Sequence, residues 1–176
     1  QKRTDSLYDN MKGECTMKMI IDGKKADSVS GETFDIINPA TGKVIDSVPK
    51  ATAEDIRMAV TAAVRGQKKW ARVPVSQRAD ILYKFIDIVE ENKESLAQTL
   101  CAENGKPISE ARGEIANIRI AFSGFIEHAK HYYGTIIPPG TEAGQEKHMQ
   151  LVTREPIGVV ACIIPFNFPC DLFDQK

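Results

Sequence analysis

The sequence predicts an α/β protein, and three features indicate this class. Residues 52–130 carry apolar side chains at steps of three and four, the spacing that is typical of amphipathic helices. Residues 19–48 contain short apolar runs separated by Asp-Gly, Asn-Pro and Thr-Gly turn signals. Residues 159–164 form an apolar run without polar alternation, which fits a strand covered on both faces in a parallel sheet.

The first part of the chain is expected to form short antiparallel strands. Met19–Lys24 combines an apolar run with an Asp-Gly turn, and the runs 34–38 and 42–48 predict two further strands. Residues 1–16 are polar and aperiodic, and the chain starts with Gln instead of Met. We therefore expect a non-native or disordered leader, with Met17 as the native start.

Three amphipathic helices are expected between residues 52 and 130. The first begins at Thr52-Ala-Glu-Asp55, which is similar to a capping box. The second begins at Ser76, continues past Asn92, and ends at Asn104-Gly-Lys-Pro107, where glycine permits a left-handed turn and proline prevents continuation. The apolar stripes that we expect in the core are Ile56, Val60, Ala63, Val64 and Trp70; Ile81, Leu82, Phe85, Ile86, Val89, Leu96 and Leu100; and Ala111, Ile115, Ile118, Phe122, either Phe125 or Ile126, and Ala129.

The last part of the chain turns extended and then apolar. Residues 135–154 are polar, with Met149–Thr153 as the clearest strand, and taken alone they indicate a loop and an edge strand. The buried strand Val159–Ile164 is expected to end at Pro165, which has no N–H to donate to a sheet. Pro169 suits the first turn of a helix that continues toward Lys176. Because no C-cap signal follows, we expect the chain to be truncated there.

Composition excludes several classes of function. The 176 residues are 42% hydrophobic and 27% charged, with a net charge of −1, so nothing favours binding to nucleic acid or to an anionic membrane surface. No apolar stretch approaches the roughly 18–20 residues that span a bilayer, and the N-terminus lacks the apolar core of a signal peptide. A cytoplasmic location is the expectation.

Neither the cysteines nor the histidines predict a metal site. Cys15, Cys101, Cys162 and Cys170 form no Cys-x-x-Cys pair, and we interpret them as reduced thiols. His128, His131 and His148 have no acidic partners at ligand spacing. Cys170, in the first turn of a helix, suggests a reactive thiol of lowered pKa, but we interpret it as a packing residue and Cys162 as a core residue.

Asn167 is the polar residue that stands out. It lies between Pro165 and Pro169, at the corner where the expected strand passes into the expected helix. In open α/β sheets, ligands bind outside the carboxyl ends of strands, next to helix N-termini. The alternative is a turn or N-cap residue whose amide bonds to the local backbone.

The strings around this corner resemble the aldehyde dehydrogenase superfamily. Glu155-Pro-Ile-Gly158, the apolar run and Pro165-Phe-Asn-Phe-Pro169 match one motif of that family. The remaining matches follow in the family's order and spacing: Asn38-Pro-Ala-Thr-Gly42, the Trp70 region, Ser76-Gln-Arg78 and Glu103-Asn-Gly-Lys-Pro107. The resemblance extends from about Met19 to Lys176.

The resemblance implies a fold and a division of the chain. Residues 17–134 would be the N-terminal part of a Rossmann-like cofactor domain, and residues 155–176 would be its return strand and the start of a helix. Residues 135–154 would be an oligomerisation excursion, so that the full-length protein is a homo-oligomer, either a dimer or a tetramer. Glu103, Lys106 and Arg78 match family positions that we interpret as structural, capping and pairing groups.

The resemblance also implies a reaction. The full-length protein would oxidise a small aldehyde to a carboxylic acid with NAD or NADP, through a cysteine thioester. Asn167 would donate to the substrate oxyanion, and Lys176 matches a lysine near the active site but equally suits a solvated helix charge. The backbone wall for the nicotinamide would be formed by Ile163, Ile164, Pro165, Phe166 and Asn167.

Part of the family's catalytic machinery is expected beyond Lys176. The nucleophilic cysteine and the general-base glutamate match no position of this chain, so these residues alone are expected to be inactive. Phe166 in place of Trp resembles the branch that handles semialdehydes, lactaldehyde and glyceraldehyde phosphate. The alternative is a truncated, non-catalytic module that associates with full-length subunits.

Overall fold

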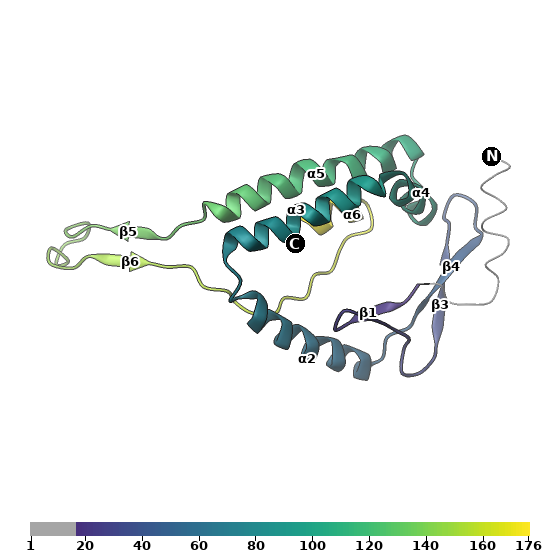
Figure 1. Cartoon of the computed structure of the whole chain (residues 1–176), viewed down its shortest axis with the longest axis horizontal. Coiled ribbons are helices and arrows are strands. Elements are labelled where there is room, and N and C mark those ends of the chain that lie inside the picture. Colours follow the sequence, from purple (N-terminus) through teal and green to yellow (C-terminus); the bar gives the residue numbers. More distant parts are fainter. Residues whose placement is uncertain (1–16) are drawn as a thin grey trace.

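The computed structural model describes residues 17–176, so Cys15 and the leader expected over residues 1–16 lie outside it. The strands are β1 (Met19–Ile21), β2 (Lys24–Ala26), β3 (Thr33–Ile37), β4 (Val44–Pro49), β5 (Thr135–Ile137) and β6 (Gln150–Val152). The helices are α2 (Ala53–Trp70), α3 (Val75–Glu91), α4 (Lys93–Asn104), α5 (Ile108–Lys130) and α6 (Pro169–Asp174). In Figure 1, α3 and α5 lie side by side, α4 sits at one end of the pair, and β5 and β6 project from the other end.

The strands pair only as local hairpins in the described part of the chain. β1 pairs with β2, β3 with β4, and β5 with β6, each in antiparallel register. The Asp22-Gly23 turn joins the first pair and has positive φ at both residues, as the Asp-Gly signal predicts. The short strands expected between residues 19 and 48 are therefore confirmed.

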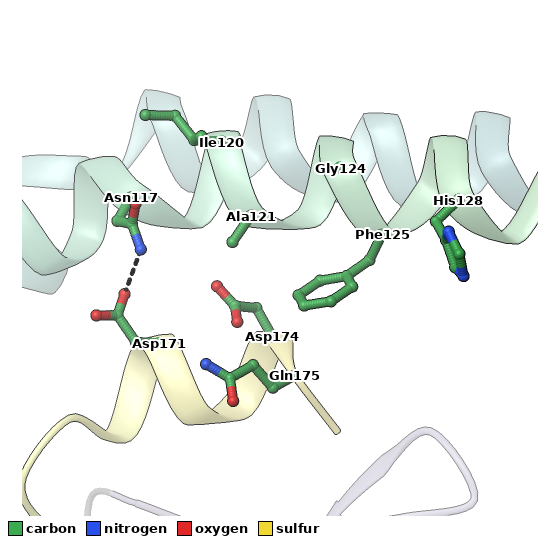
Figure 2. Close-up of a pocket in the computed structure, with 9 residues that line it drawn as sticks. All are labelled: Asn117, Ile120, Ala121, Gly124, Phe125, His128, Asp171, Asp174 and Gln175. Carbon is green, nitrogen blue, oxygen red and sulfur yellow. Dashed lines mark hydrogen bonds between the residues drawn. The ribbon is translucent and has the colours of Figure 1, made fainter.

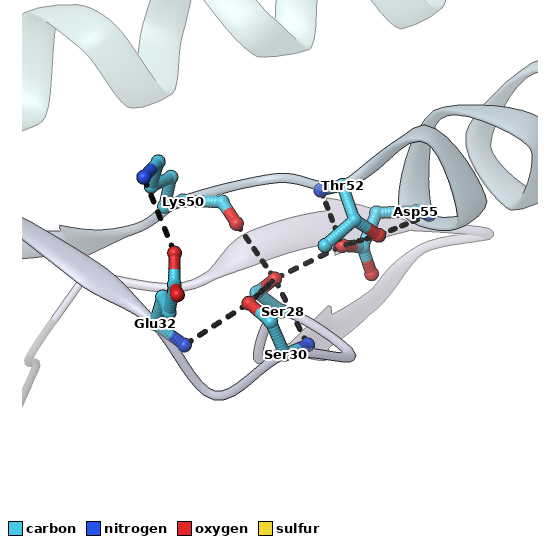
Figure 3. Close-up of polar contacts among 6 residues, drawn as sticks. All are labelled: Ser28, Ser30, Glu32, Lys50, Thr52 and Asp55. Carbon is cyan, nitrogen blue, oxygen red and sulfur yellow. Dashed lines mark hydrogen bonds and ion pairs between the residues drawn. The ribbon is translucent and has the colours of Figure 1, made fainter.

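The capping box at the start of α2 is confirmed and is larger than the sequence indicates. The Asp55 carboxylate accepts the Thr52 N–H at 2.7 Å, and the Thr52 hydroxyl accepts the Asp55 N–H at 3.3 Å. The same carboxylate also bonds to the Ser28 hydroxyl and to the Val29 N–H, as Figure 3 shows for Ser28. Asp55 is only 1% exposed, so these bonds tie the loop after β2 to the start of α2.

The hydrophobic core lies between α3, α4 and α5. One cluster contains Val89, Ala97, Leu100, Ala111, Ile115 and Ile118, and a smaller one contains Ala79, Ile86 and Ile126. Of the two alternatives at the end of the α5 stripe, Ile126 is buried and Phe125 is 48% exposed. Most residues of the stripes predicted for these helices are thus buried or half-buried, as expected. The exceptions are Ile81, Leu96 and Ala129, which are exposed and correct the prediction at these positions.

Asn92 divides the second expected helix into α3 and α4. Its backbone leaves helical geometry with φ −106° and ψ 10°, and its side-chain amide donates to the Ile88 carbonyl at 2.8 Å. The N-cap of α3 is Pro74 without a side-chain cap bond, and Ser76 falls inside the first turn. The start at Ser76 is therefore corrected.

Gly105 ends α4 in the left-handed conformation that the sequence predicts. Its φ is 79°, and its N–H donates to the Cys101 carbonyl. A Cβ at this position would lie 2.6 Å from Cγ of Pro39, in the turn between β3 and β4. A glycine is therefore required both by the turn and by the close approach of this hairpin.

The predicted buried strand Val159–Ile164 is wrong for this chain. The segment between β6 and α6 is extended but has no strand partner in residues 17–176. Ile163 is 87% exposed and Cys162 is also exposed, so the expectation that Cys162 is a core residue is corrected as well. An apolar run becomes a sheet strand only where neighbouring strands accept and donate its backbone hydrogen bonds.

The expectation that the apolar stripe of α2 lies in the core is also wrong. Ile56, Val60 and Val64 are 56%, 49% and 42% exposed, and Ala62 is the buried apolar residue of this helix. The helical period was predicted correctly, but no part of the described chain covers that face. Within residues 17–176, no helix combines the length and apolar composition that crossing a bilayer requires.

Candidate functional site

The loop around Asn167 joins the extended segment to α6. Phe168 is the N-cap of α6, and Pro169 occupies the first turn as predicted. Asn167 is exposed and precedes the cap, and within the described residues its side-chain amide has no hydrogen-bond partner. The alternative of an N-cap role for Asn167 is therefore wrong in this structure, and its amide is available to a ligand.

Three side chains hold the backbone on either side of Asn167, and we call Asn104, Lys106 and Glu114 the loop clamp. The Asn104 amide donates to the Phe166 carbonyl at 2.6 Å. Lys106 Nζ donates to the Asn167 carbonyl at 3.0 Å. The loop is thus fixed by residues at the end of α4 and on α5.

The loop clamp is organised by a buried ion pair. Lys106 Nζ contacts the Glu114 carboxylate, and their side chains are 8% and 1% exposed. The other carboxylate oxygen of Glu114 accepts the Cys170 N–H, in the first turn of α6, at 2.7 Å. Lys106 Nζ also lies 4.5 Å from the centroid of the Phe168 ring, a cation–π distance.

α6 itself is docked on α5 and α3. The Asn117 amide donates to Asp171 at 2.9 Å, as Figure 2 shows. On another side of α6, the Phe173 ring lies 6.1 Å from Phe122 and 6.3 Å from Phe85. These contacts stabilise the helix that follows Asn167, which is too short to be stable alone.

Cys170 has the surroundings of an unreactive thiol. Burial, together with the nearby carboxylates of Glu114 and Asp171, raises the pKa of its thiol to about 11, and Lys106 opposes this shift by a smaller amount. A thiol is a nucleophile only as the thiolate. The raised pKa and the packing of Cys170 against the core support its interpretation as a packing residue.

A groove of about 520 Å³ lies between α5 and α6 and is shown in Figure 2. The Asp174 carboxylate points into it and has no hydrogen-bond partner in the described residues, although Asp174 is only 7% exposed. Desolvation, and then the charge of Asp171, raise the pKa of Asp174. The residues that line the groove are Asn117, Ile120, Ala121, Gly124, Phe125, His128, Asp171, Asp174 and Gln175.

The other predicted site residues are spread along the extended segment and α6. Ile163 and Phe166 are 87% and 68% exposed, Pro165 is also exposed, and Ile164 is half-buried. Lys176 follows the far end of α6, and its N–H donates to the Phe173 carbonyl. The structure therefore does not bring Lys176 next to Asn167.

Glu114 is a site residue that was not predicted, although its position in the sequence carries a signal. Glu114 lies three residues after Ala111 and four before Ile118, so it falls on the apolar stripe of α5. A carboxylate on a buried stripe requires a partner. Lys106 is interpreted from the sequence as a pairing group. The sequence does not show that Glu114 is its partner or that it contacts the Asn167 loop, because both are separated from it along the chain.

No metal centre is formed by the described residues. Within residues 17–176, no three His, Cys, Asp or Glu side chains are arranged to hold an ion. His128, in the last turn of α5, and His131, its C-cap residue, are both exposed.

Comparison with known proteins identifies the chain. The model of the aldehyde dehydrogenase family matches residues 26–176. This chain belongs to the aldehyde dehydrogenase family.

Individual members of the aldehyde dehydrogenase family are much longer than this chain. The 3-sulfolactaldehyde dehydrogenase of Pseudomonas putida is 42% identical over 156 residues, which cover 89% of this chain and 31% of that protein. The chain thus spans about a third of the length of the curated relatives it matches.

Solved structures of aldehyde dehydrogenases share this fold. The NADP-dependent glyceraldehyde-3-phosphate dehydrogenase from Bacillus halodurans C-125, complexed with NADP, has a TM-score of 0.86 at 31% identity. The match covers 93% of this chain and 34% of that one. The NAD-dependent aldehyde dehydrogenase from Sinorhizobium meliloti has a TM-score of 0.81 at 34% identity and covers 90% and 32% of the two chains. The α/β aldehyde dehydrogenase fold predicted from the sequence is confirmed.

Proposed function

We propose that this chain is the N-terminal part of an enzyme that oxidises a small aldehyde to a carboxylic acid with NAD or NADP. The observation that carries the proposal is the exposed amide of Asn167, which has no partner among residues 17–176 and sits on a loop fixed by the loop clamp. A fixed N–H donor is what an aldehyde oxygen requires as it gains negative charge. The NAD- and NADP-dependent relatives support the choice of cofactor.

The residues present fit one end of the cofactor. Ile163 and Phe166 offer exposed apolar side chains in the same extended segment, and such a surface suits a nicotinamide ring. Residues 17–176 contain no Gly-x-Gly-x-x-Gly turn that would hold the phosphates. When bound, NAD or NADP supplies the acceptor for the hydride that leaves the substrate.

We infer that the remaining catalytic groups are supplied by other residues of the longer protein. A cysteine thiolate would attack the aldehyde, and a glutamate would activate the water that hydrolyses the thioester. We assign neither role to Cys170 or Glu114, because the first has a raised pKa and the second is held in a buried ion pair. Among the relatives with named substrates, the 3-sulfolactaldehyde and glyceraldehyde-3-phosphate dehydrogenases favour a small polar aldehyde. A cytoplasmic location and a homo-oligomer stay predictions from the sequence.

The test is Asn167→Ala in the full-length product of the gene that contains these residues. We expect kcat to fall by about 10²–10³-fold, because one oxyanion donor is lost, with cofactor affinity within a few-fold. Gln98→Ala is the matched control, since Gln98 is an exposed amide on α4 that bonds only to Glu94 among the described residues. An unchanged kcat in an assay limited by chemistry would overturn the role of Asn167.

The 176 residues alone are expected to be inactive. An oxyanion donor has no charge to stabilise when the nucleophile is missing. The measurement is NADH or NADPH formation by the purified 176-residue chain over a range of aldehydes. Cofactor-dependent turnover by this chain would show that the division of catalytic groups is wrong.

A second candidate function is association with full-length subunits, and the projecting β5–β6 hairpin favours it (Figure 1). Ile136 and Leu151 pair across this hairpin and are 63% and 67% exposed. Ile136→Lys with Leu151→Lys should abolish co-purification of the tagged chain with the full-length protein. Ile120→Lys is the control, because it places the same charge at a residue of α5 that is 73% exposed, and co-purification should be unchanged. Equal loss in both variants would contradict the assignment to the hairpin.

A further inference from the structure

Lys106 and Glu114 form an unusual ion pair for this chain. Among the ion pairs of residues 17–176, it alone has both side chains buried, at 8% and 1% exposure. Arg112 and Glu94, by contrast, join α5 to α4 with side chains that are 55% and 52% exposed. Burying two charges costs solvation free energy, so a buried ion pair is weak evidence for a stabilising role.

The contacts of this pair all converge on the Asn167 loop. Lys106 binds the carbonyl oxygen of Asn167 itself and lies against the ring of the next residue, Phe168. Glu114 binds the N–H of Cys170, at the start of α6. The charged groups thus fix the backbone at Asn167 and just after it.

Asn104 holds the backbone on the N-terminal side of Asn167. Its amide donates to the carbonyl of Phe166, the residue before Asn167. Gly105 and Pro107 flank Lys106. The side chains of Asn104 and Lys106 therefore both start from the end of α4, where the chain turns toward α5. The backbone is held before, at and after Asn167, while the Asn167 side chain itself has no hydrogen-bond partner in the described part of the chain.

We propose that Lys106 and Glu114, with Asn104, are positioning residues that set the direction of the Asn167 amide toward the substrate oxygen. This inference rests on the proposed function, because it assumes that Asn167 is an oxyanion donor. The loop clamp never touches the substrate, and it acts only through the backbone of the loop. An error of about 1 Å in the position of a catalytic group can cost about 100-fold in rate, which is the reason for such a device.

A double-mutant cycle between Lys106 and Asn167 tests the inference in the full-length product of the gene. The measured quantity is the rate of NADH or NADPH formation in a single turnover, together with the dissociation constant of the cofactor. Lys106→Met should lower this rate by about 10- to 100-fold and change the cofactor constant by less than about threefold. In the Asn167→Ala background, Lys106→Met should lower the rate by no more than about twofold, because its effect passes through the amide already removed.

Two further variants keep the test decisive. Asn104→Ala removes one backbone bond without leaving a buried charge, so its cycle with Asn167→Ala decides the question if Lys106→Met does not fold. We expect Asn104→Ala to lower the single-turnover rate by about tenfold, again only when Asn167 is present. Arg112→Met is the matched control. Arg112 lies on α5, as Glu114 does, and its removal breaks an exposed ion pair with Glu94 that does not contact the Asn167 loop.

The failures of the two proposals are distinguishable. If Asn167→Ala lowers the rate but Lys106→Met and Asn104→Ala do not, only the positioning role is overturned. If the losses multiply in the double variants, the loop clamp is a general structural feature and the inference is again overturned. If Asn167→Ala has no effect, or the full-length product is inactive, the proposed function falls and this inference falls with it.

Discussion

Cys162 and Cys170 stand on either side of the Asn167 loop and meet different surroundings. Cys162 is exposed in the extended segment, whereas Cys170 is half-buried beside the Glu114 carboxylate. Burial and neighbouring negative charge both disfavour a thiolate, so the pKa of Cys170 rises to about 11. The same carboxylate that holds α6 in place therefore suppresses the reactivity of a thiol at its first turn.

The reactivity of the two thiols can be compared directly in the 176-residue chain. At pH 8, a pKa of about 11 leaves about one Cys170 in a thousand as thiolate, so iodoacetamide should modify Cys162 first. The Cys170 rate should rise with pH as the medium approaches pH 11, because the thiolate fraction then increases. Peptide mass spectrometry over a time course is the measurement.

The control for this prediction is the chain in concentrated urea, where both thiols lose their surroundings and should react at similar rates. Modification of Cys170 at pH 8 as fast as that of Cys162 in the folded chain would contradict the burial of the thiol and its contact with Glu114.

At the scale of elements, α5 is the helix that α3, α4 and α6 contact. It packs against α3, α4 and α6, and it supplies Glu114 to the loop clamp. Its two faces differ sharply, since Ile118 is 5% exposed in the core and Ile120 is 73% exposed. The position of the Asn167 loop thus depends on how the buried face of α5 is packed.

A matched pair of substitutions on α5 tests this dependence. Ile118→Ala removes a buried side chain, and such a change typically costs about 2–5 kcal/mol, so the local opening of α3, α4 and α5 should become much easier. Ile120→Ala should change the opening free energy by less than about 0.5 kcal/mol, because its side chain is already in water. Amide hydrogen exchange across the three helices is the measurement. Equal protection in the two variants would show that the core is not where the structure places it.

At the scale of the whole molecule, this chain buries little and exposes much. The apolar residues buried in residues 17–176 include four alanines, so the core contains few large side chains: Ala62, Ala79, Ile86, Val89, Ala97, Leu100, Ala111, Ile115, Ile118 and Ile126. Large apolar residues are exposed on α2, on the hairpin β5–β6 and along 157–166. Exposed apolar surface on this scale marks contact with other protein segments.

The 176-residue chain is therefore expected to be helical, poorly cooperative in unfolding, and prone to self-association. An apolar segment with free backbone N–H and C=O groups is a template for pairing with another chain. Sedimentation velocity at several concentrations should show association, and amides at 159–164 should exchange rapidly in whatever monomer is present.

Charges placed in that segment should reduce the association. Val160→Lys with Ile163→Lys should shift the chain toward monomer. Ile20→Lys is the matched control, since Ile20 is 74% exposed in β1, away from this segment. A monomeric wild-type chain with a sharp two-state denaturant transition and slow exchange at 159–164 would show the prediction to be wrong.

The sequence by itself determined the local elements of this protein. Turn signals such as Asp22-Gly23, the capping box at Thr52, the left-handed Gly105 and the apolar periods of α3 and α5 each depend on neighbours in the chain. Backbone sterics and side chains within one or two turns decide such features, so their residues predict them. The family, and Asn167 as the candidate donor, followed from motifs that are also local.

Only the tertiary structure decided what each element faces. The same kind of apolar period is core in α5 but exposed in α2, and the apolar run 159–164 is no strand, because burial and sheet pairing depend on segments distant in the chain. The loop clamp shows the same dependence, since it joins the turn after α4 and the stripe of α5 to the loop before α6. Its hydrogen bonds need distances of about 3 Å between residues far apart in sequence, and the folded packing of the helices on one another brings them together.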